Sequence, residues 1–190
     1  MRSPPWRAPH SIRAAAVLLL SCCAPALQAA DAAKVLGWVE WARFEPEHVE
    51  VKAKLDTGAK TSSIHAVDIE PFERDGSDWV RFKMPLDSHS HKAGDDDELV
   101  FERPVVRTVL IKQHQRESSR RYVIEIDVCL AGERFTTPAT LADRSRFLYP
   151  LLLGRVALEG RAVVDPAGKH RALCVCPDAA STATDPESTP

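Results

Sequence analysis

The segment that decides the fold is residues 49–62, which read VEVKAKLDTGAKTS. Apolar side chains alternate with charged ones over its first seven residues, and this period of two predicts a half-buried strand. The strand runs directly into Asp56-Thr57-Gly58. Glycine lets a backbone turn sharply and approach another segment closely, so the sequence predicts a carboxylate on a tight loop at the end of a strand.

A second segment, PLLLGR at residues 150–155, carries an apolar-apolar-Gly triplet followed by Arg155 and a short helix-like stretch. Asp56 is the candidate catalytic residue, because an aspartic peptidase uses two carboxylates that share one proton and activate one water. One carboxylate is the base, and the other, protonated, polarises the scissile carbonyl. The hydroxyl of Thr57 and the small side chain of Ala59 suit the support of such a loop.

Together these segments resemble a bacterial family of retropepsin-like aspartic peptidases, whose members are often labelled putative ATP-dependent zinc proteases. The matching pieces are KLDTGAKTS at 54–62, DIEPF at 68–72, WVRF at 79–82, PLLLGR at 150–155 and VVDP at 163–166. The resemblance implies an all-β fold, a small closed barrel of the single-lobe acid-protease type with one short helix. It also implies catalysis by Asp56, and some relatives are linked to ATP-grasp glutamate ligases, which points to unusual peptide or isopeptide substrates. The residues expected to support the active-site loop are Thr57, Gly58, Ala59, Leu153, Gly154 and Arg155.

The sequence departs from the viral retropepsin pattern in two ways. Lys60 stands where those enzymes carry an acid that pairs with the arginine, so Arg155 needs another partner, and Asp165, Asp68 and Glu70 are the candidates. Only one Asp-Thr-Gly occurs, so the second carboxylate comes either from a second subunit of a twofold homodimer or from the same chain. Asp165 is the candidate second acid in the chain, although an Asp before Pro more simply ends a strand.

Two functions from different classes fit these observations. The first is an aspartic endopeptidase acting on peptide or protein substrates. The second is a non-catalytic module that uses the same fold to bind an extended peptide by strand addition, which requires no chemistry. The missing second Asp-Thr-Gly favours the second hypothesis, and the paired motifs favour the first.

The remainder of the central region predicts short strands separated by turns, as in a small barrel or sandwich. The expected strands are residues 35–44, 49–55, 62–69, the two arms of a hairpin over 71–84, 99–111, 122–130, 134–141 and 161–165. The hairpin turn is expected at Asp75-Gly76, and Pro166 is expected to stop the last strand.

The two ends of the chain have different compositions from the domain expected at residues 31–177. Residues 1–30 contain three arginines and no acid, then an apolar run and small residues, which predicts a secretory signal peptide and a periplasmic protein. Cys22 lies in a lipobox-like LSC sequence, so a lipoprotein anchored to the membrane at Cys22 is the alternative. Residues 178–190 have the composition of a disordered tail. Without residues 1–30 the formal charge is −5, from 22 basic and 27 acidic residues, so no nucleic-acid partner is expected.

Cysteines and histidines suggest one disulfide and no cofactor. An oxidising compartment permits one bridge, from Cys129 to Cys174 or Cys176, since the last two are too close in sequence to pair well with each other. His89, His91 and the acids at 95–98 fall in a polar stretch that reads as a solvated loop. Neither a His-Glu-x-x-His helix nor a Gly-rich phosphate loop occurs, so no metal and no ATP site is expected.

Overall fold

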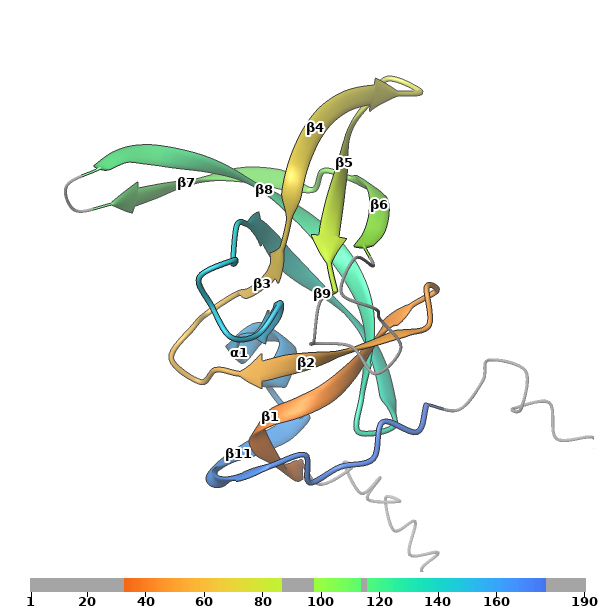
Figure 1. The fold of residues 1–190 in the computed structure, drawn as a ribbon, viewed down its shortest axis with the longest axis vertical. Coiled ribbons are helices and arrows are strands. Elements are labelled where there is room, and N and C mark those ends of the chain that lie inside the picture. The colour runs from red at the N-terminus through yellow and green to blue at the C-terminus, as the bar shows by residue number, and fades with distance from the viewer. Residues whose placement is uncertain (1–32, 87–97, 114–115, 177–190) are drawn as a thin grey trace, which may run out of the picture. The chain divides into compact units, whose positions relative to one another are not determined.

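The computed structural model describes residues 33–86, 98–113 and 116–176 (Figure 1). The expected signal peptide at 1–30, the tail at 178–190 and the histidines and acids of 89–97 lie outside the described residues. Within this part of the chain the structure is almost entirely β, with eleven strands and one short helix.

Most strands in the first half of the domain follow the sequence patterns. The elements are β1 (Lys34–Glu45), β2 (Val49–Leu55), β3 (Ser62–His65), β4 (Val67–Arg74), β5 (Ser77–Pro85), β6 (Glu98–Pro104), β7 (Arg107–Gln113), β8 (Arg116–Leu130), β9 (Glu133–Ala142), β10 (Leu151–Leu153), α1 (Arg155–Leu158) and β11 (Ala162–Lys169). The expected hairpin turn is confirmed, because Asp75 and Gly76 both have positive φ between β4 and β5.

A closed barrel forms the centre of the domain. The larger sheet has the order β11-β1-β2-β10-β3-β9-β8-β7, and an additional pairing of β1 with β8 closes a ring of six of these strands. In that pairing Ala42 lies opposite Leu130 and Glu45 lies opposite Asp127. The expected all-β fold, a small retropepsin-like barrel with one short helix, is therefore confirmed.

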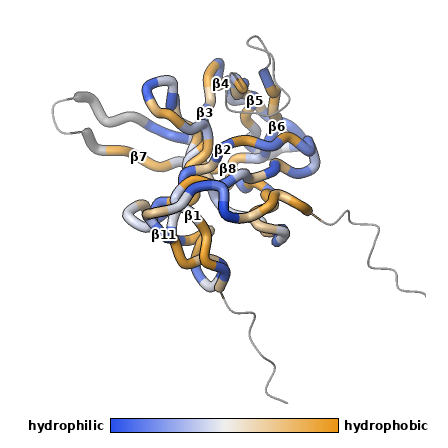
Figure 2. Tube along the Cα trace, turned by 60° about the horizontal axis from the view of Figure 1, so that its bottom comes forward, coloured by the Kyte–Doolittle hydropathy of each residue, from blue (hydrophilic) through white to orange (hydrophobic). Residues whose placement is uncertain are grey.

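The barrel core is filled by the inward faces of these strands. Val51, Ala53 and Leu55 of β2 are at most 3% exposed, and the lysines between them point outward, as the alternation predicts. Apolar and polar residues alternate along the traced strands in Figure 2.

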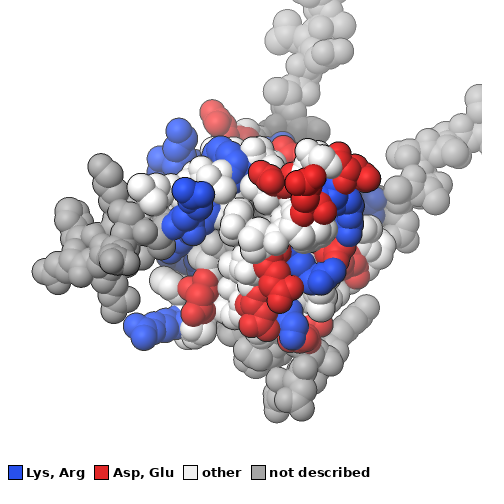
Figure 3. Space-filling model, turned by 90° about the horizontal axis from the view of Figure 1, so that it is seen from above, with Lys and Arg blue, Asp and Glu red and all other residues white. Residues whose placement is uncertain are grey.

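The smaller sheet, β4-β5-β6, packs on the barrel through Phe101, whose ring stacks on Phe82 of β5 and meets Phe44 of β1 edge-on. On the face drawn in Figure 3, acidic and basic side chains lie next to one another.

Three expectations about strand limits are wrong. The run 99–111 is not one strand, because it divides into β6 and β7, which belong to different sheets. Pro166 does not stop the last strand, since β11 continues to Lys169. β11 lies at the edge of its sheet, where a residue without an N–H can be accommodated, and its register with β1 shifts between Gly37 and Val39. The run 62–69 is not one strand either, because it divides into β3 of the larger sheet and the start of β4 in the smaller sheet.

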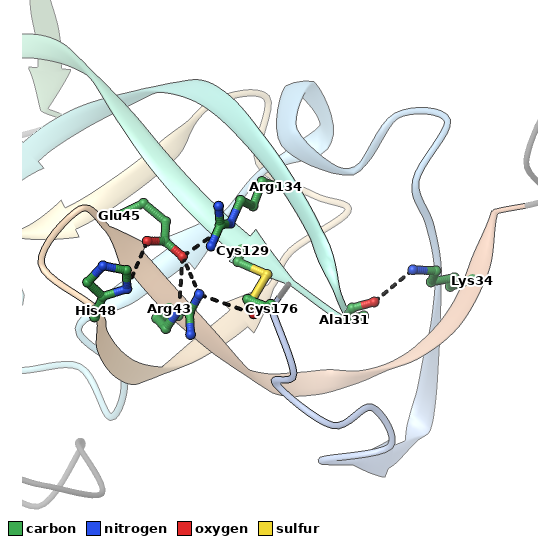
Figure 4. The surroundings of a disulfide bond; sticks show 8 residues. All are labelled: Lys34, Arg43, Glu45, His48, Cys129, Ala131, Arg134 and Cys176. Atoms are coloured by element: carbon green, nitrogen blue, oxygen red, sulfur yellow. Dashed lines mark hydrogen bonds and ion pairs between the residues drawn. A yellow bond between two sulfur atoms is a disulfide. The ribbon is translucent and has the colours of Figure 1, made fainter. Parts of the chain in front are cut away.

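The segment after β11 is fastened to β1 and β8. Cys129 of β8 is bonded to Cys176 with a Cα–Cα distance of 6.2 Å, which confirms one of the two expected bridges (Figure 4). Beside it, the carboxylate of Glu45 forms an ion pair with the guanidinium of Arg43 at 2.8 Å and lies 3.5 Å from that of Arg134. Further along, the buried Glu40 carboxylate accepts the backbone N–H groups of residues 37, 171 and 172. These contacts hold the chain end against the barrel.

Candidate active site

Asp56 lies immediately beyond β2, where the parallel strand β10 also ends. Its backbone N–H donates to the carbonyl of Leu153 at 2.9 Å, which continues the β2–β10 pairing by one residue. One carboxylate oxygen, Oδ1, accepts the N–H groups of Gly58 at 2.9 Å and Ala59 at 3.3 Å. The other, Oδ2, accepts the Lys54 ammonium at 3.0 Å. The carboxylate is therefore fixed through both oxygens, with its side chain 24% exposed.

The surroundings of Asp56 favour its ionised form. Partial burial acts to raise the pKa of Asp56, but the hydrogen bond from Lys54 and the N–H groups of Gly58 and Ala59 outweigh it. The pKa of Asp56 therefore lies below its ordinary value, and the group is a carboxylate at neutral pH.

Replacing Lys54 by Met is expected to raise the pKa of Asp56, because it removes the strongest contact that favours the charged form. The carboxyl carbon of Asp56, followed by NMR as a function of pH, should then titrate at higher pH than in the wild-type protein. Lys52→Met is the matched control, since Lys52 lies two residues earlier on the same strand and over the Trp41 ring. An unchanged titration in Lys54→Met would contradict the assignment.

Two glycines make the loop fit against β10 and α1. A Cβ on Gly154 would lie 2.7 Å from the carbonyl atoms of Thr61, so the residue after β10 has no space for a side chain. The N–H of Gly154 donates to the hydroxyl of Ser62. A Cβ on Gly58 would lie 3.1 Å from Oδ1 of Asp56. Gly58 is not in the left-handed region, so its close approach to the carboxylate, and not a positive φ, is what a side chain there would disturb.

Gly154→Ala is expected to reduce the free energy of unfolding by about 1–3 kcal/mol, because the new methyl group meets backbone that cannot rotate away. Urea denaturation measures the loss. Gly58→Ala is the comparison, since its methyl group meets only a side-chain oxygen and should cost less stability. Wild-type stability in Gly154→Ala would mean that the loop is not packed in this way.

Arg155 supports the loop from α1, but not through an acid. Its Nη1 donates to the carbonyls of Thr57 at 2.9 Å and Gly58 at 3.0 Å, and its N–H donates to Ala59. The expected ion pair of Arg155 with Asp165, Asp68 or Glu70 is wrong, because Nη1 of Arg155 is bound to backbone carbonyls and the three acids have other partners. In these contacts Thr57 contributes its carbonyl, and its hydroxyl has no hydrogen-bond partner among the described residues. Lys60 is exposed, so its charge does not oppose Arg155 in a buried site.

The three acids proposed for Arg155 have other partners. Asp165 binds Arg171 at 2.6 Å and accepts the N–H of Ala167, which is ordinary turn chemistry. Asp68 lies 3.5 Å from Lys83, and Glu70 lies 4.0 Å from Arg81. Strand β1 separates β11 from β2, so Asp165 is about two strand spacings, roughly 10 Å, from the Asp56 loop. No second carboxylate is hydrogen-bonded to Asp56 in the described part of the chain.

Lys54 and Arg144 were not among the residues predicted for the site. Lys54 is two residues before Asp56 on an alternating strand, so it shares the outward face, and this spacing could have identified it. Arg144 lies in the connection between β9 and β10, where burial lowers its pKa and the charge of Asp56 acts in the opposite direction. No local pattern marks Arg144, because its position depends on the long-range pairing of β9 with β3.

Residues 35–172 match the family described as retropepsin-like aspartic endopeptidase RimB. The chain belongs to this RimB-like family. The resemblance seen in the sequence is thereby confirmed, with the match extending over the whole barrel.

Curated relatives of this RimB-like chain carry a different name. A probable alpha-L-glutamate ligase of Shewanella pealeana is 40% identical over 134 residues, covering 70% of this chain and 28% of the relative. One of Desulfotalea psychrophila is 36% identical over 137 residues, covering 72% of this chain and 29% of the relative. The chain thus spans less than a third of the relatives' length, and their ligase name belongs to much longer proteins.

A solved structure resembles the domain itself. A Legionella pneumophila protein of unknown function has a TM-score of 0.61 and 34% identity to this RimB-like chain, over 74% of this chain and 98% of that one. Within the described residues, no group of three or more His, Cys, Asp or Glu side chains could hold a metal ion. Nor does that part of the chain contain a helix long and apolar enough to cross a bilayer.

Proposed function

We propose that the chain hydrolyses peptide bonds with a water activated by Asp56. The observation that carries the proposal is the carboxylate at the ends of β2 and β10. It accepts hydrogen bonds from two N–H groups and Lys54, and Gly154 and Arg155 pack against its loop. Its lowered pKa suits the base of a carboxyl pair, which must be ionised when the substrate arrives.

The reaction requires a second, protonated carboxyl group. The base takes a proton from water, and the water oxygen attacks the peptide carbon while the protonated group donates to the carbonyl oxygen. The tetrahedral intermediate then collapses with cleavage of the C–N bond: the leaving nitrogen takes the proton that the base accepted from water, and a hydroxyl of the intermediate returns its proton to the other carboxylate. We propose that Asp56 of a second copy supplies this group in a twofold homodimer, in which one motif provides a matched pair. Exposure of Thr57 and Gly58 at the loop, and of Val163 on the edge strand β11, supports this arrangement.

The names of the curated relatives suggest the substrate. They are probable alpha-L-glutamate ligases, and a segment homologous to this domain forms part of each. A hydrolase that accompanies such a ligase would act on the peptide bonds that glutamate ligation forms. We therefore propose α-linked glutamyl peptides as the substrate class, and ligation itself is not proposed for this chain.

Export to the periplasm is also a proposal, with a lipoprotein anchored at Cys22 as the alternative. The disulfide between Cys129 and Cys176 supports an oxidising compartment. Mass spectrometry of the native protein distinguishes the two: a mature N-terminus near Ala30 or Asp31 indicates a soluble form, and an acylated Cys22 indicates a lipoprotein.

The activity is tested directly with an α-linked oligoglutamate in ¹⁸O-water. We expect shorter oligomers whose new carboxyl termini carry one ¹⁸O atom, since water is the attacking group. Binding of the peptide with no cleavage at any protein concentration would favour the second candidate, a peptide-binding module. The absence of a second carboxylate beside Asp56 among the described residues is the observation in favour of that candidate.

A further inference from the structure

Lys54 has its ammonium group directly beside the Asp56 carboxylate. Its Nζ lies 3.0 Å from Oδ2 of Asp56, and the Lys54 side chain is 40% exposed. Lys54 is in β2 and Asp56 follows the end of that strand, so a separation of two residues directs both side chains to the outward face. A substrate that reaches the Asp56 carboxylate therefore also meets the ammonium group.

The ammonium of Lys54 has donors that the described residues do not use. An ammonium group carries three N–H donors and no acceptor. One donor goes to Asp56, whose carboxylate is the one acid within ion-pair distance of Nζ among the described residues. The residues opposite Lys54 on the neighbouring strands are Val39 of β1 and Leu152 of β10, and both are apolar. Two donors thus remain for a ligand at this point.

Four other lysines of the described chain are engaged away from the active-site loop. Lys83 forms ion pairs with two acids of the smaller sheet. Lys34 donates to a backbone carbonyl at 2.7 Å, and Lys52 and Lys169 lie over tryptophan rings. Compared with these four, Lys54 is distinguished by a measured contact with the carboxylate that activates water in the proposed reaction.

We infer that Lys54 binds a side-chain carboxylate of the substrate next to the scissile bond, through the two donors that Asp56 leaves free. The inference rests on the proposed function and deepens it, because it assigns the residue that selects acidic peptides. A hydrogen bond from an ammonium to a carboxylate is about 2.7–2.9 Å long. The substrate carboxylate is then within roughly 6 Å of Oδ2 of Asp56, so the acid belongs to a residue adjoining the bond under attack.

The charge of the Lys54–Asp56 pair changes during the proposed reaction. In the free protein the ammonium and the carboxylate compensate each other. When Asp56 takes a proton from water, its carboxyl group becomes neutral and the ammonium of Lys54 loses its counter-charge. The substrate carboxylate restores the balance at that moment, so its contact with Lys54 is stronger in the transition state than in the bound substrate. An interaction of this kind increases the rate as well as the affinity.

Binding is measured in the full chain carrying Asp56→Asn, so that the result does not depend on turnover. The probes, followed by calorimetry, are an α-linked pentaglutamate and a pentaglutamine, which has the same backbone carbonyls without the charges. We expect the pentaglutamate to bind at least about tenfold more tightly, a preference that Lys54→Gln removes and Lys54→Arg retains in part. Lys52→Gln is the matched control: it removes the same charge from the same face of β2 and should keep the preference.

Three outcomes would overturn the inference. These are equal affinities for the two peptides with Lys54 in place, a preference that persists in Lys54→Gln, and an equal loss of preference in Lys52→Gln. Circular dichroism checks the fold of each variant, and the charge-retaining Lys54→Arg remains informative if the glutamine variant is unfolded. Cleavage of both peptides at equal rates by the wild-type chain, together with equal affinities, would refute the role of Lys54 and leave the hydrolase proposal standing. A Lys54-dependent preference with no cleavage of either peptide would refute hydrolysis alone.

Discussion

Asp56→Asn is expected to abolish peptide cleavage while preserving the fold. Asparagine has the shape of aspartate, and its amide oxygen can still accept the N–H groups of Gly58 and Ala59. It cannot take a proton from water at neutral pH, so the loss should reach roughly 10²–10⁴-fold or more, the size expected for a general base. Initial rates on the oligoglutamate, measured beside thermal unfolding, give both quantities.

Asp165→Asn is the discriminating control for this experiment. Because the Asp165 carboxylate is bound to Arg171 and to the turn at Ala167, its loss should leave cleavage within a few-fold of wild type. If Asp165→Asn were as inactive as Asp56→Asn in a folded protein, Asp165 would instead be the second acid. Undiminished cleavage in Asp56→Asn would rule out the aspartic mechanism.

Removing the disulfide should give the largest loss of stability. The bridge between Cys129 and Cys176 closes a loop across a sequence separation of 47, and it joins the chain end to the barrel strand β8. A bridge that closes a loop of this length restricts the unfolded chain and so stabilises the folded state by about 4 kcal/mol in the chain-entropy model. Measured stabilisation by disulfides is usually about 2–4 kcal/mol. Chemical denaturation of Cys129→Ser should show a loss in that range.

The experiment needs a background in which Cys174 is also replaced. Cys174 is two residues from Cys176 and is free, although burial raises the pKa of its thiol to about 11 and makes it a weak nucleophile. Cys174→Ser alone should change stability by less than about 0.5 kcal/mol, as is usual away from such structural features. A Cys129→Ser variant as stable as this control would mean that the bridge does not constrain the domain.

Local patterns were sufficient to predict the part of the fold nearest the candidate site. Alternation identified β2 residue for residue, because it depends only on neighbouring side chains. The division between β6 and β7 was not predictable in this way, since sheet membership depends on partners distant in sequence. β11 passes Pro166 for a similar reason: whether a strand is at an edge is a property of the sheet.

The contacts of the site were less predictable than its residues. Asp56, Gly154 and Arg155 were identified from the two motifs, yet a search among acids could not find the carbonyl partners of Arg155. Arg144 was not identified, because its place after β9 depends on the pairing of β9 with β3, which in turn pairs with β10. Motifs therefore identified the groups of the loop, and the three-dimensional pairing determined which charges surround it.

The most direct test of a paired Asp56 is a mixing experiment. Wild-type and Asp56→Asn chains are combined in equal amounts, allowed to exchange subunits, and assayed at constant total concentration beside sedimentation. If each active site needs Asp56 from two copies, only dimers with two wild-type chains are active, and about one quarter of the wild-type activity should remain. Retention of about one half, or full activity in a protein that sediments only as a monomer, would contradict the account.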